Sequence, residues 1–387
     1  MKKLFRALLV VLLVAVFISG CSSEKVLKIG FNTQLTGPDS YIGQAAKIAL
    51  EERVKEINDA GGLGGYTLKL ITYDSRSEIP DAVAAAKRLL EQDKVHAMIG
   101  PEWTGAAVPI AQIANDSKIP VIATTASNVT VTVDESGNVY PFMFRTCFID
   151  PYQGYALADY AYVDMGLRKV ASLTDISGAY SVGIQKYFKD HFEELGGVVV
   201  AEEGYQANDQ EFRAQLSKID QTEAEAILVP TATYRDIALI SKQGAALNMD
   251  VIYLGVDGWV ADELLDMAGA ELEGSVLTSG VSSEQPEFAD YNKAFEERNG
   301  LKPNVYAYYA LDALEMILYG AEKSLEANKE ITSQGIRDAI EGMKDVQLFT
   351  SKVTMEPDTH NPHNKPVLII EIKDSKWHQL KMFQPEN

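Results

Sequence analysis

Short apolar runs alternate along the chain with longer segments in which apolar residues recur every three or four positions. The first apolar run covers residues 27–31, and the next segment, 42–60, has the spacing of an amphipathic helix. The alternation continues through predicted strands and helices at 67–73, 81–92, 95–99, 105–116 and 119–123. Strands that alternate with helices form parallel sheets covered by helices on both faces. The pattern therefore predicts an α/β fold.

The rhythm restarts after a predicted strand at 142–145 and builds a second, similar half. The predicted strands of this half lie at 169–173, 198–201, 226–229 and 251–254, with helices at 182–195, 212–219, 236–246 and 261–267. A mostly helical region (286–341) and a last strand (366–372) follow. Because this tail is too short for a domain, we expect it to return to the two halves. The predicted lobes comprise 27–148 with about 279–355, and about 150–276 with 356–385.

The first twenty residues have the features of a secretory signal. Lys2, Lys3 and Arg6 precede an apolar run at 7–18, which is shorter than a membrane-spanning helix. Small residues follow and lead directly to Cys21, an arrangement that resembles the lipobox of bacterial lipoproteins. This resemblance implies removal of residues 1–20 and attachment of lipid to Cys21 on the outer side of the cytoplasmic membrane. A plain secretory signal with an unrelated cysteine is the alternative.

Composition and charge exclude several classes of protein. Hydrophobic residues make up 46% and charged residues 23% of the 387 positions, which excludes a disordered chain. The formal net charge of −20 opposes binding to nucleic acid. Two cysteines are too few for a disulfide scaffold, and the second, Cys147, has apolar neighbours that predict a buried thiol.

Several segments resemble motifs of enzymes, metal sites or cofactor sites, but their sequence context does not fit these functions. The glycine run at 61–65 follows a helix and precedes a strand, the opposite order to a phosphate-binding loop. His360 and His363 stand in a proline-containing segment without further metal ligands nearby, so we expect a solvated loop there. The sequence has no Gly-x-Ser-x-Gly motif. We therefore expect no catalytic activity, no metal and no cofactor.

Polar residues at the predicted strand ends are the candidates for binding. Thr104 follows the strand at 95–99 and opens a helix, where a hydroxyl and free amides suit a carboxylate. A second run rich in hydroxyls covers 124–128, and Asp257 follows the strand at 251–254 in the other half. Together these groups suit an amino-acid zwitterion held between two lobes. Thr104 as a helix cap and Asp257 as a turn residue remain the structural alternatives.

The chain from 27 to about 385 resembles the leucine/isoleucine/valine-binding proteins, which have the type I periplasmic-binding fold and serve ABC importers. The segments that carry this resemblance are Lys28-Ile29-Gly30, Leu35-Thr36-Gly37-Pro38, Ile57-Asn58-Asp59-Ala60-Gly61-Gly62, Ile99-Gly100-Pro101, Pro120-Val121-Ile122, Phe144-Arg145-Thr146 and Asp150-Pro151-Tyr152-Gln153-Gly154. Each segment is short, but their order and spacing extend over nearly the whole chain. The resemblance implies two lobes that close on a ligand by hinge rotation.

The resemblance also implies roles for single residues. Thr104 corresponds to a residue that holds the ligand carboxylate, Thr125 to one whose carbonyl accepts from the ammonium, and Ser127 to one that contacts both ends. Asp257 corresponds to an acidic residue that pairs with the ammonium from the other lobe. Aromatic residues at the positions of Tyr41 and Tyr180 line the side-chain pocket, and Asp150 falls at the hinge.

Departures from the family pattern leave the ligand open. At Thr233 the family often has a ligand-facing tyrosine, whereas here the tyrosine is Tyr234. Trp103 replaces a cysteine of some members and is expected to bind the ligand. Thr233 and Tyr234 are candidates for either ligand binding or the hinge, and Trp259 has either a pocket role or a core role. We expect a branched-chain, other apolar or aromatic amino acid as the ligand, and ABC permease subunits as partners of a monomer. The alternatives are a binder of aromatic acids, amides or urea, and a sensing domain without a transport role.

Overall fold

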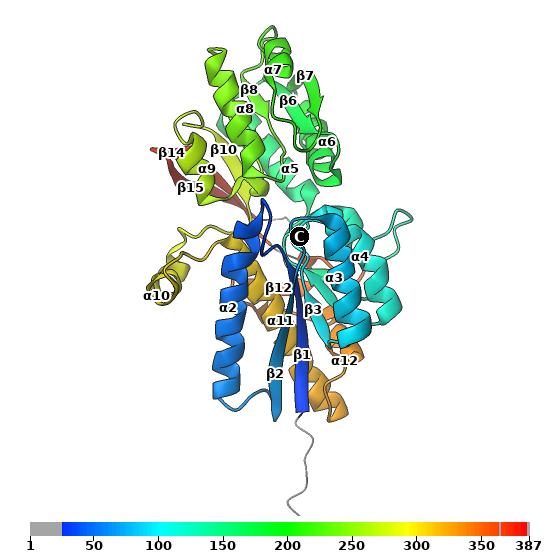
Figure 1. Cartoon of the computed structure of the whole chain (residues 1–387). Helices are drawn as coiled ribbons and strands as arrows, with labels where there is room; N and C mark the ends of the chain where they lie inside the picture. Colours follow the sequence, from blue (N-terminus) through cyan, green and yellow to red (C-terminus); the bar gives the residue numbers. More distant parts are fainter. Residues whose placement is uncertain (1–24, 364, 385–387) are drawn as a thin grey trace, which may run out of the picture.

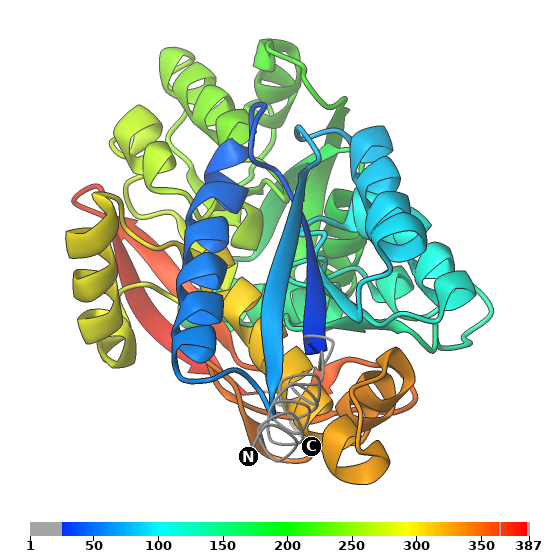
Figure 2. The same ribbon diagram turned by 60° about the horizontal axis from the view of Figure 1, so that its bottom comes forward.

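The computed structural model describes residues 25–363 and 365–384 and contains two α/β lobes, one above the other in Figure 1. The first lobe contains β1 (Lys25–Thr33), α2 (Ser40–Asp59), β2 (Tyr66–Asp74), α3 (Ile79–Lys87), β3 (Ala97–Ile99), α4 (Thr104–Ser117), β4 (Val121–Ala123) and β5 (Met143–Arg145). Its sheet has the order β2-β1-β3-β4-β5 and is parallel throughout. The helices α3 and α4 cover one face and α2 the other, as Figure 2 shows.

The second lobe repeats this arrangement. Its elements are α5 (Asp150–Asp159), β6 (Lys169–Asp175), α6 (Ala179–Glu194), β7 (Val198–Tyr205), α7 (Arg213–Ile219), β8 (Ala226–Leu228), α8 (Tyr234–Ala246), β9 (Ile252–Gly255), α9 (Asp262–Ala268) and β10 (Val276–Ser279). Its seven-stranded sheet has the order β15-β14-β10-β9-β8-β6-β7. The strands β6 to β10 are parallel, whereas β14 and β15 are added antiparallel at one edge.

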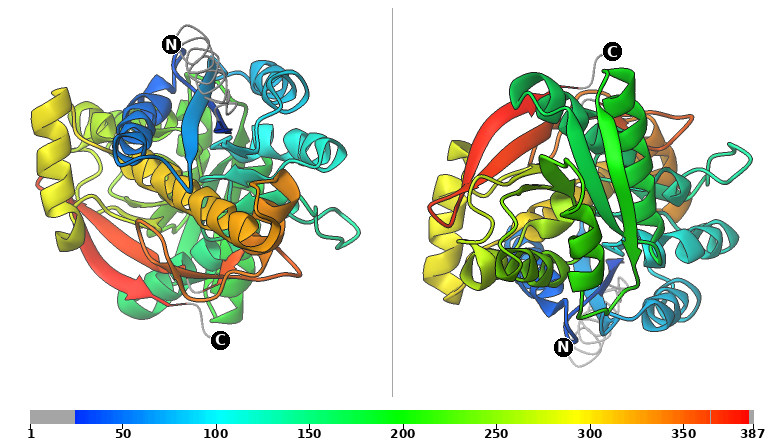
Figure 3. Two further views of the ribbon diagram at one scale, coloured as in Figure 1. Left: turned by 90° about the horizontal axis from the view of Figure 1, so that it is seen from below. Right: turned by 90° about the horizontal axis from the view of Figure 1, so that it is seen from above.

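The last part of the chain completes both lobes. It contains α10 (Ala289–Asn299), α11 (Val305–Asn328), α12 (Ser333–Glu341), β11 (Val346–Gln347), β12 (Lys352–Met355), β13 (Pro362–His363), β14 (Val367–Lys373) and β15 (Lys376–Phe383). In the core of the first lobe, α11 and α12 pack beside α2, while β14 and β15 join the second sheet (Figure 3). Within the described residues the chain therefore crosses between the lobes three times.

Short helical segments extend or link these elements. The π-helical turns Arg88–Asp93 and Tyr160–Asp164 extend α3 and α5, and 3-10 turns lie at Val129–Val131, Asp257–Trp259 and Pro286–Phe288. The described residues contain no helix long and apolar enough to cross a membrane.

The local signals explain the main elements. Leu27, Ile29 and Phe31 of β1 are fully buried, as expected for a central strand covered on both faces. The helix α2 ends where Gly61 and Gly62 adopt positive φ angles of 103° and 79°, and a Cβ on Gly62 would lie 2.2 Å from the Tyr66 carbonyl oxygen. The glycine run is therefore a helix stop, as predicted.

Two expectations about the later part of the chain were wrong. The return to the second lobe begins at β14 and not at residue 356, because β13 pairs with β12 against the first lobe. His360 is not in a solvated loop: it is fully buried, stacks on Phe144 at 4.1 Å between ring centroids, and contacts the Met143 carbonyl oxygen. Cys147 is buried, as expected, and burial raises the pKa of its thiol to about 12.

A buried ion pair lies where the chain makes its third crossover. Lys365 stands just before β14, and its Nζ donates to Asp312 Oδ2 of α11 at 2.8 Å. The same ammonium donates to Thr350 Oγ1 at 2.8 Å, and the Thr350 amide donates to Asp312 Oδ1 at 2.8 Å. Lys365 is 2% exposed and Asp312 is 0% exposed. These hydrogen bonds hold the segment around Lys365, just before β14, against α11 of the first lobe.

Candidate ligand-binding cleft

A cavity of about 980 Å³ lies between the two lobes. Its first-lobe wall includes Glu102 and Trp103, from the loop between β3 and α4, and Thr104, the first residue of α4. Its second-lobe wall includes Tyr180, near the start of α6, and Asp257, which follows β9. These loops leave the carboxyl ends of parallel strands, the edge at which open α/β sheets bind ligands. The volume falls in the range of small-molecule sites, about 300–1,000 Å³.

The first-lobe wall presents a hydroxyl and free amides. Thr104 is the first residue of α4, and the first amides of a helix have no partner within the helix. The Thr104 hydroxyl oxygen accepts a long hydrogen bond from the Asn128 amide at 3.4 Å. Thr125 Oγ1 donates to the Glu102 carbonyl oxygen at 2.7 Å and so joins the two loops of this wall. A carboxylate at the start of α4 would find donors and a favourable helix dipole.

The second-lobe wall presents a half-buried carboxylate, that of Asp257. The Tyr180 hydroxyl donates to Asp257 Oδ1, and the Gly258 amide donates to the Tyr180 hydroxyl oxygen at 3.2 Å. Burial raises the pKa of Asp257 to about 6, although Tyr180 and Gln153 act in the opposite direction. No basic side chain of the described residues lines the cavity beside this carboxylate, and an ammonium group is the ligand moiety that would satisfy it.

Asp150 lies between the lobes, behind the cavity. It is the first residue of α5, directly after the first crossover, and its Oδ2 accepts from Asn128 Nδ2 of the first lobe at 2.9 Å. Asn128 Nδ2 also donates to the Ala179 carbonyl oxygen at 3.1 Å. Burial raises the pKa of Asp150 to about 7. Ser127 is also fully buried next to Asn128, and the structure does not bring it to the cavity wall.

The pair Tyr41 and Tyr234 forms a contact across the lobes. Their rings meet edge to face at 5.2 Å between centroids, and neither residue lies on the cavity wall. Beside them, Arg235 Nη2 donates to Asp39 Oδ1 at 2.5 Å. Thr233 caps α8 by accepting from the Arg235 amide. These residues join the lobes beside the cavity. The sequence predicted Tyr41 in the side-chain pocket, and Thr233 and Tyr234 as either ligand-binding or hinge residues; none of the three is on the cavity wall.

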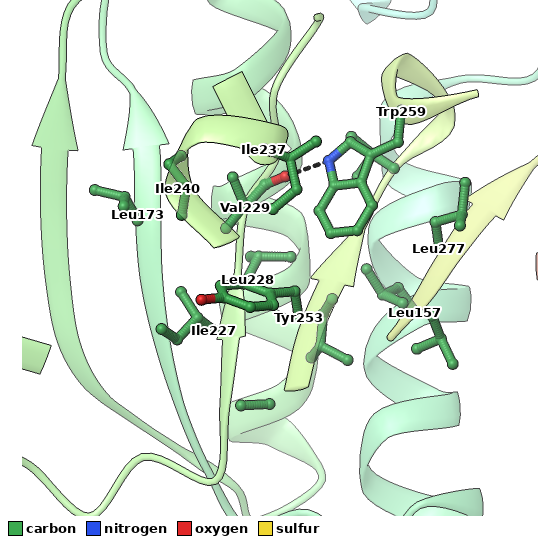
Figure 4. Close-up of a cluster of buried hydrophobic side chains, with 14 of the residues drawn as sticks. Leu157, Leu173, Ile227, Leu228, Val229, Ile237, Ile240, Tyr253, Trp259 and Leu277 are labelled. Carbon is green, nitrogen blue, oxygen red and sulfur yellow. Dashed lines mark hydrogen bonds between the residues drawn. The ribbon is translucent and has the colours of Figure 1, made fainter. Parts of the chain in front are cut away.

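Trp259 belongs to the hydrophobic core of the second lobe (Figure 4). Its side chain is 0% exposed, and Nε1 donates to the Val229 carbonyl oxygen at 3.0 Å. A Cβ on Gly255 would lie 2.4 Å from the indole ring, so glycine is required there for the ring to pack over β9. Of the two roles considered, core packing applies, and the interpretation as a pocket residue is wrong.

The wall residues that the sequence reasoning missed include Glu102, Tyr306 and Tyr309. The charge of Glu102, directly after a buried strand, was an available signal. The tyrosines lie in the first turns of α11, and only the aromatic run 306–309 could have indicated them. Of the described residues that line the cavity, none is lysine, arginine or histidine. No group of three potential metal ligands occurs among the described residues.

Comparison with known proteins identifies the family. Residues 26–376 match the model of the periplasmic binding protein family, so the chain belongs to this family. A Leu/Ile/Val-binding protein homologue of Brucella suis biovar 1 is 27% identical over 313 residues, which are 81% of this chain and 82% of the relative.

Solved structures share the fold. A branched-chain amino acid transporter substrate binding protein of Streptococcus pneumoniae, in complex with isoleucine, is similar at a TM-score of 0.83 and 26% identity, over 93% of this chain and 100% of that chain. A solute binding protein of an ABC transporter from R. palustris, in complex with benzoate, shares the fold at a TM-score of 0.78 and 24% identity, over 92% and 96% of the two chains. The chain is thus an extracytoplasmic solute-binding protein of the ABC-transporter type with the type I fold, and not an enzyme.

Proposed function

We propose that the protein captures a free α-amino acid between its lobes and delivers it to an ABC importer. The observation that carries this proposal is the position of two groups on opposite walls of one cavity. Thr104 and the first α4 amides lie on one wall, and Asp257 lies on the other. The first group suits a carboxylate and the second an ammonium group. A ligand with both ends would make contacts in the closed form that the open form lacks, so binding would favour closure.

An aromatic acid without an amine is a poorer ligand for this cavity. Such a ligand would leave Asp257 buried and unpaired, and the described wall offers no cationic side chain for a second anionic group. Lipid attachment at Cys21 lies outside the described residues and stays a prediction. Binding of an amino acid is also expected of a sensing domain, so the ligand does not distinguish sensing from transport. A permease gene next to the gene of this protein would favour transport.

A thermal-shift screen of residues 22–387 tests the ligand class. We expect one or more free amino acids to raise the melting temperature, because a ligand that binds only the folded state stabilises it by mass action. Benzoate, acetamide and urea serve as the comparison set. A shift with benzoate, and none with any amino acid, would contradict the proposal.

We expect amino-acid affinity to fall as the pH falls through about 6. Burial raises the pKa of Asp257 to about 6 in the free protein, and a bound ammonium would lower it again. Below that pH, binding requires Asp257 to release a proton, which weakens affinity by up to about tenfold per pH unit. Calorimetry at about pH 5 and pH 7.5 would measure this.

A further inference from the structure

One ion pair joins the two lobes beside the cavity without belonging to its wall. Arg235, the second residue of α8, donates from Nη2 to Asp39 Oδ1 and from Nη1 to the Pro38 carbonyl oxygen of the first lobe, each at 2.5 Å. The side chains of Arg235 and Asp39 are 31% and 24% exposed, so water reaches the pair only in part. Asp39, Pro38 and Arg235 are not among the residues that line the cavity.

The first lobe holds its half of this contact in place. The Asp39 amide donates to Ser77 Oγ at 3.1 Å, and the same hydroxyl donates to the Thr36 carbonyl oxygen at 3.1 Å. The Thr36 amide donates to Asp74 Oδ1, at the end of β2, at 3.2 Å. The segment that carries Pro38 and Asp39 is thus tied to residues of its own lobe.

The second lobe holds Arg235 in the same way. Its amide donates to the side chain of Thr233, the N-cap of α8, at 3.4 Å. The next carboxylate along the helix, Asp236, accepts from the Tyr205 hydroxyl at 2.9 Å within the second lobe. Because each partner of the ion pair is attached to its own lobe, a hinge rotation that separates the lobes at this edge would break the contact.

We propose that Arg235 and Asp39 form a latch, a contact of the closed form that raises the affinity for the ligand without touching the ligand. This inference rests on the proposed function in one respect, because it assumes that the ligand binds by closing the lobes. The measured affinity is the affinity of the binding-competent form reduced by the fraction of molecules that adopt it. A contact between the lobes increases that fraction, so the latch should tighten binding and slow release.

The latch has an electrostatic signature that a purely steric contact lacks. The Debye length falls from about 10 Å at 0.1 M salt to about 3 Å at 1 M, so salt weakens a partly exposed ion pair. Exposed pairs have small effects, and the two charge-assisted hydrogen bonds of Arg235 place this pair at the upper end of that range. We therefore expect the ratio of closed to open molecules to change about three- to tenfold when the pair is removed.

The test is the distance between the lobes, measured by pulsed electron paramagnetic resonance on residues 22–387. Spin labels are attached at Lys55→Cys in α2 and Lys242→Cys in α8, both exposed positions, whereas Cys147 is buried. Distances are recorded without amino acids and during titration with an equimolar mixture of the common proteinogenic amino acids. In Arg235→Gln, the concentration that closes half of the molecules should rise about three- to tenfold. Raising the salt from about 0.1 M to about 1 M should raise this concentration more in the wild type than in the variant.

Two further variants separate the latch from a general loss of charge or structure. Arg213→Gln removes an exposed charge of the same lobe that pairs with Glu211, and it should titrate like the wild type. The exchange Asp39→Arg with Arg235→Asp restores opposite charges and should recover part of the loss. Asp39→Arg alone places two like charges opposite each other and should open the lobes further than Arg235→Gln.

The outcomes distinguish the latch from the proposed function. A titration of Arg235→Gln that matches the wild type at both salt concentrations would overturn the latch and leave the proposed function standing. If the mixture changes no distance in the wild type, the proposed function is overturned. The latch then depends on the distances without amino acids, which should still be longer in Arg235→Gln, and equal distances would overturn it as well.

Discussion

Replacing Asp257 with alanine is expected to weaken amino-acid binding by about 2–5 kcal/mol, which is roughly 30- to 5,000-fold in affinity. Asp257 is a carboxylate of the second-lobe wall that accepts a hydrogen bond from the Tyr180 hydroxyl, and no basic side chain of the described residues lines the cavity. The variant would leave the ammonium of the bound ligand without its counter-charge in a closed, poorly solvated cleft. Calorimetry with the best amino acid of the thermal-shift screen measures the loss.

Two further variants test whether the loss of affinity is specific to the charge of Asp257. Asp220→Ala removes an exposed carboxylate of the same lobe and should bind like the wild type. Asp257→Asn keeps an oxygen acceptor without the charge and should lose less affinity than the alanine variant. Unchanged binding by Asp257→Ala would remove the ammonium site from the second lobe.

Replacing Lys365 with methionine is expected to lower the free energy of unfolding by about 3–5 kcal/mol, the usual cost of removing one partner of a buried ion pair. Asp312 would stay fully buried without its cationic partner, and Thr350 would be its remaining donor among the described residues. Urea denaturation of the ligand-free protein, followed by circular dichroism, measures the shift of the midpoint.

The matched control uses an ion pair on the surface. Lys381 contacts Asp164 at 2.7 Å with side chains 41% and 33% exposed, and Lys381→Met should change stability by no more than about 1 kcal/mol. The double variant Lys365→Met with Asp312→Leu should recover much of the loss, because it removes the stranded charge. Equal effects of Lys365→Met and Lys381→Met would show that the buried pair adds little to stability.

The elements that could be predicted from the sequence are those in which buried positions form a recognisable run or period of apolar residues. The inner strands β1, β3, β4, β8 and β9 belong to parallel sheets covered on both faces, and such strands are nearly continuous apolar runs. The helix α5 was missed because it begins with Asp150-Pro151, which also suits a turn, and is buried on several sides without a clear apolar stripe. The edge strand β15 was missed because exposed polar residues alternate along it.

The binding site could be predicted only as far as strand ends define it. Thr104 and Asp257 follow buried strands, and the topology alone brings such positions to one edge. The direction of a side chain within a loop is not determined by position, so Trp259 points into the core and Ser127 lies behind the wall. Tyr306 and Tyr309 reach the cavity from α11. This helix packs in the first lobe although it follows most of the second lobe in the sequence, so its position could not be predicted from neighbouring elements.

The three crossovers impose an order on the synthesis of this protein. When a ribosome has made β1 to β5, only α2 covers the face of the first sheet on which α11 and α12 later pack. Nearly the whole second lobe must emerge before those helices exist, and the last two strands of the second sheet come later still. Neither lobe is encoded by one continuous stretch of the gene. Each lobe can therefore be completed only after part of the other lobe has been translated.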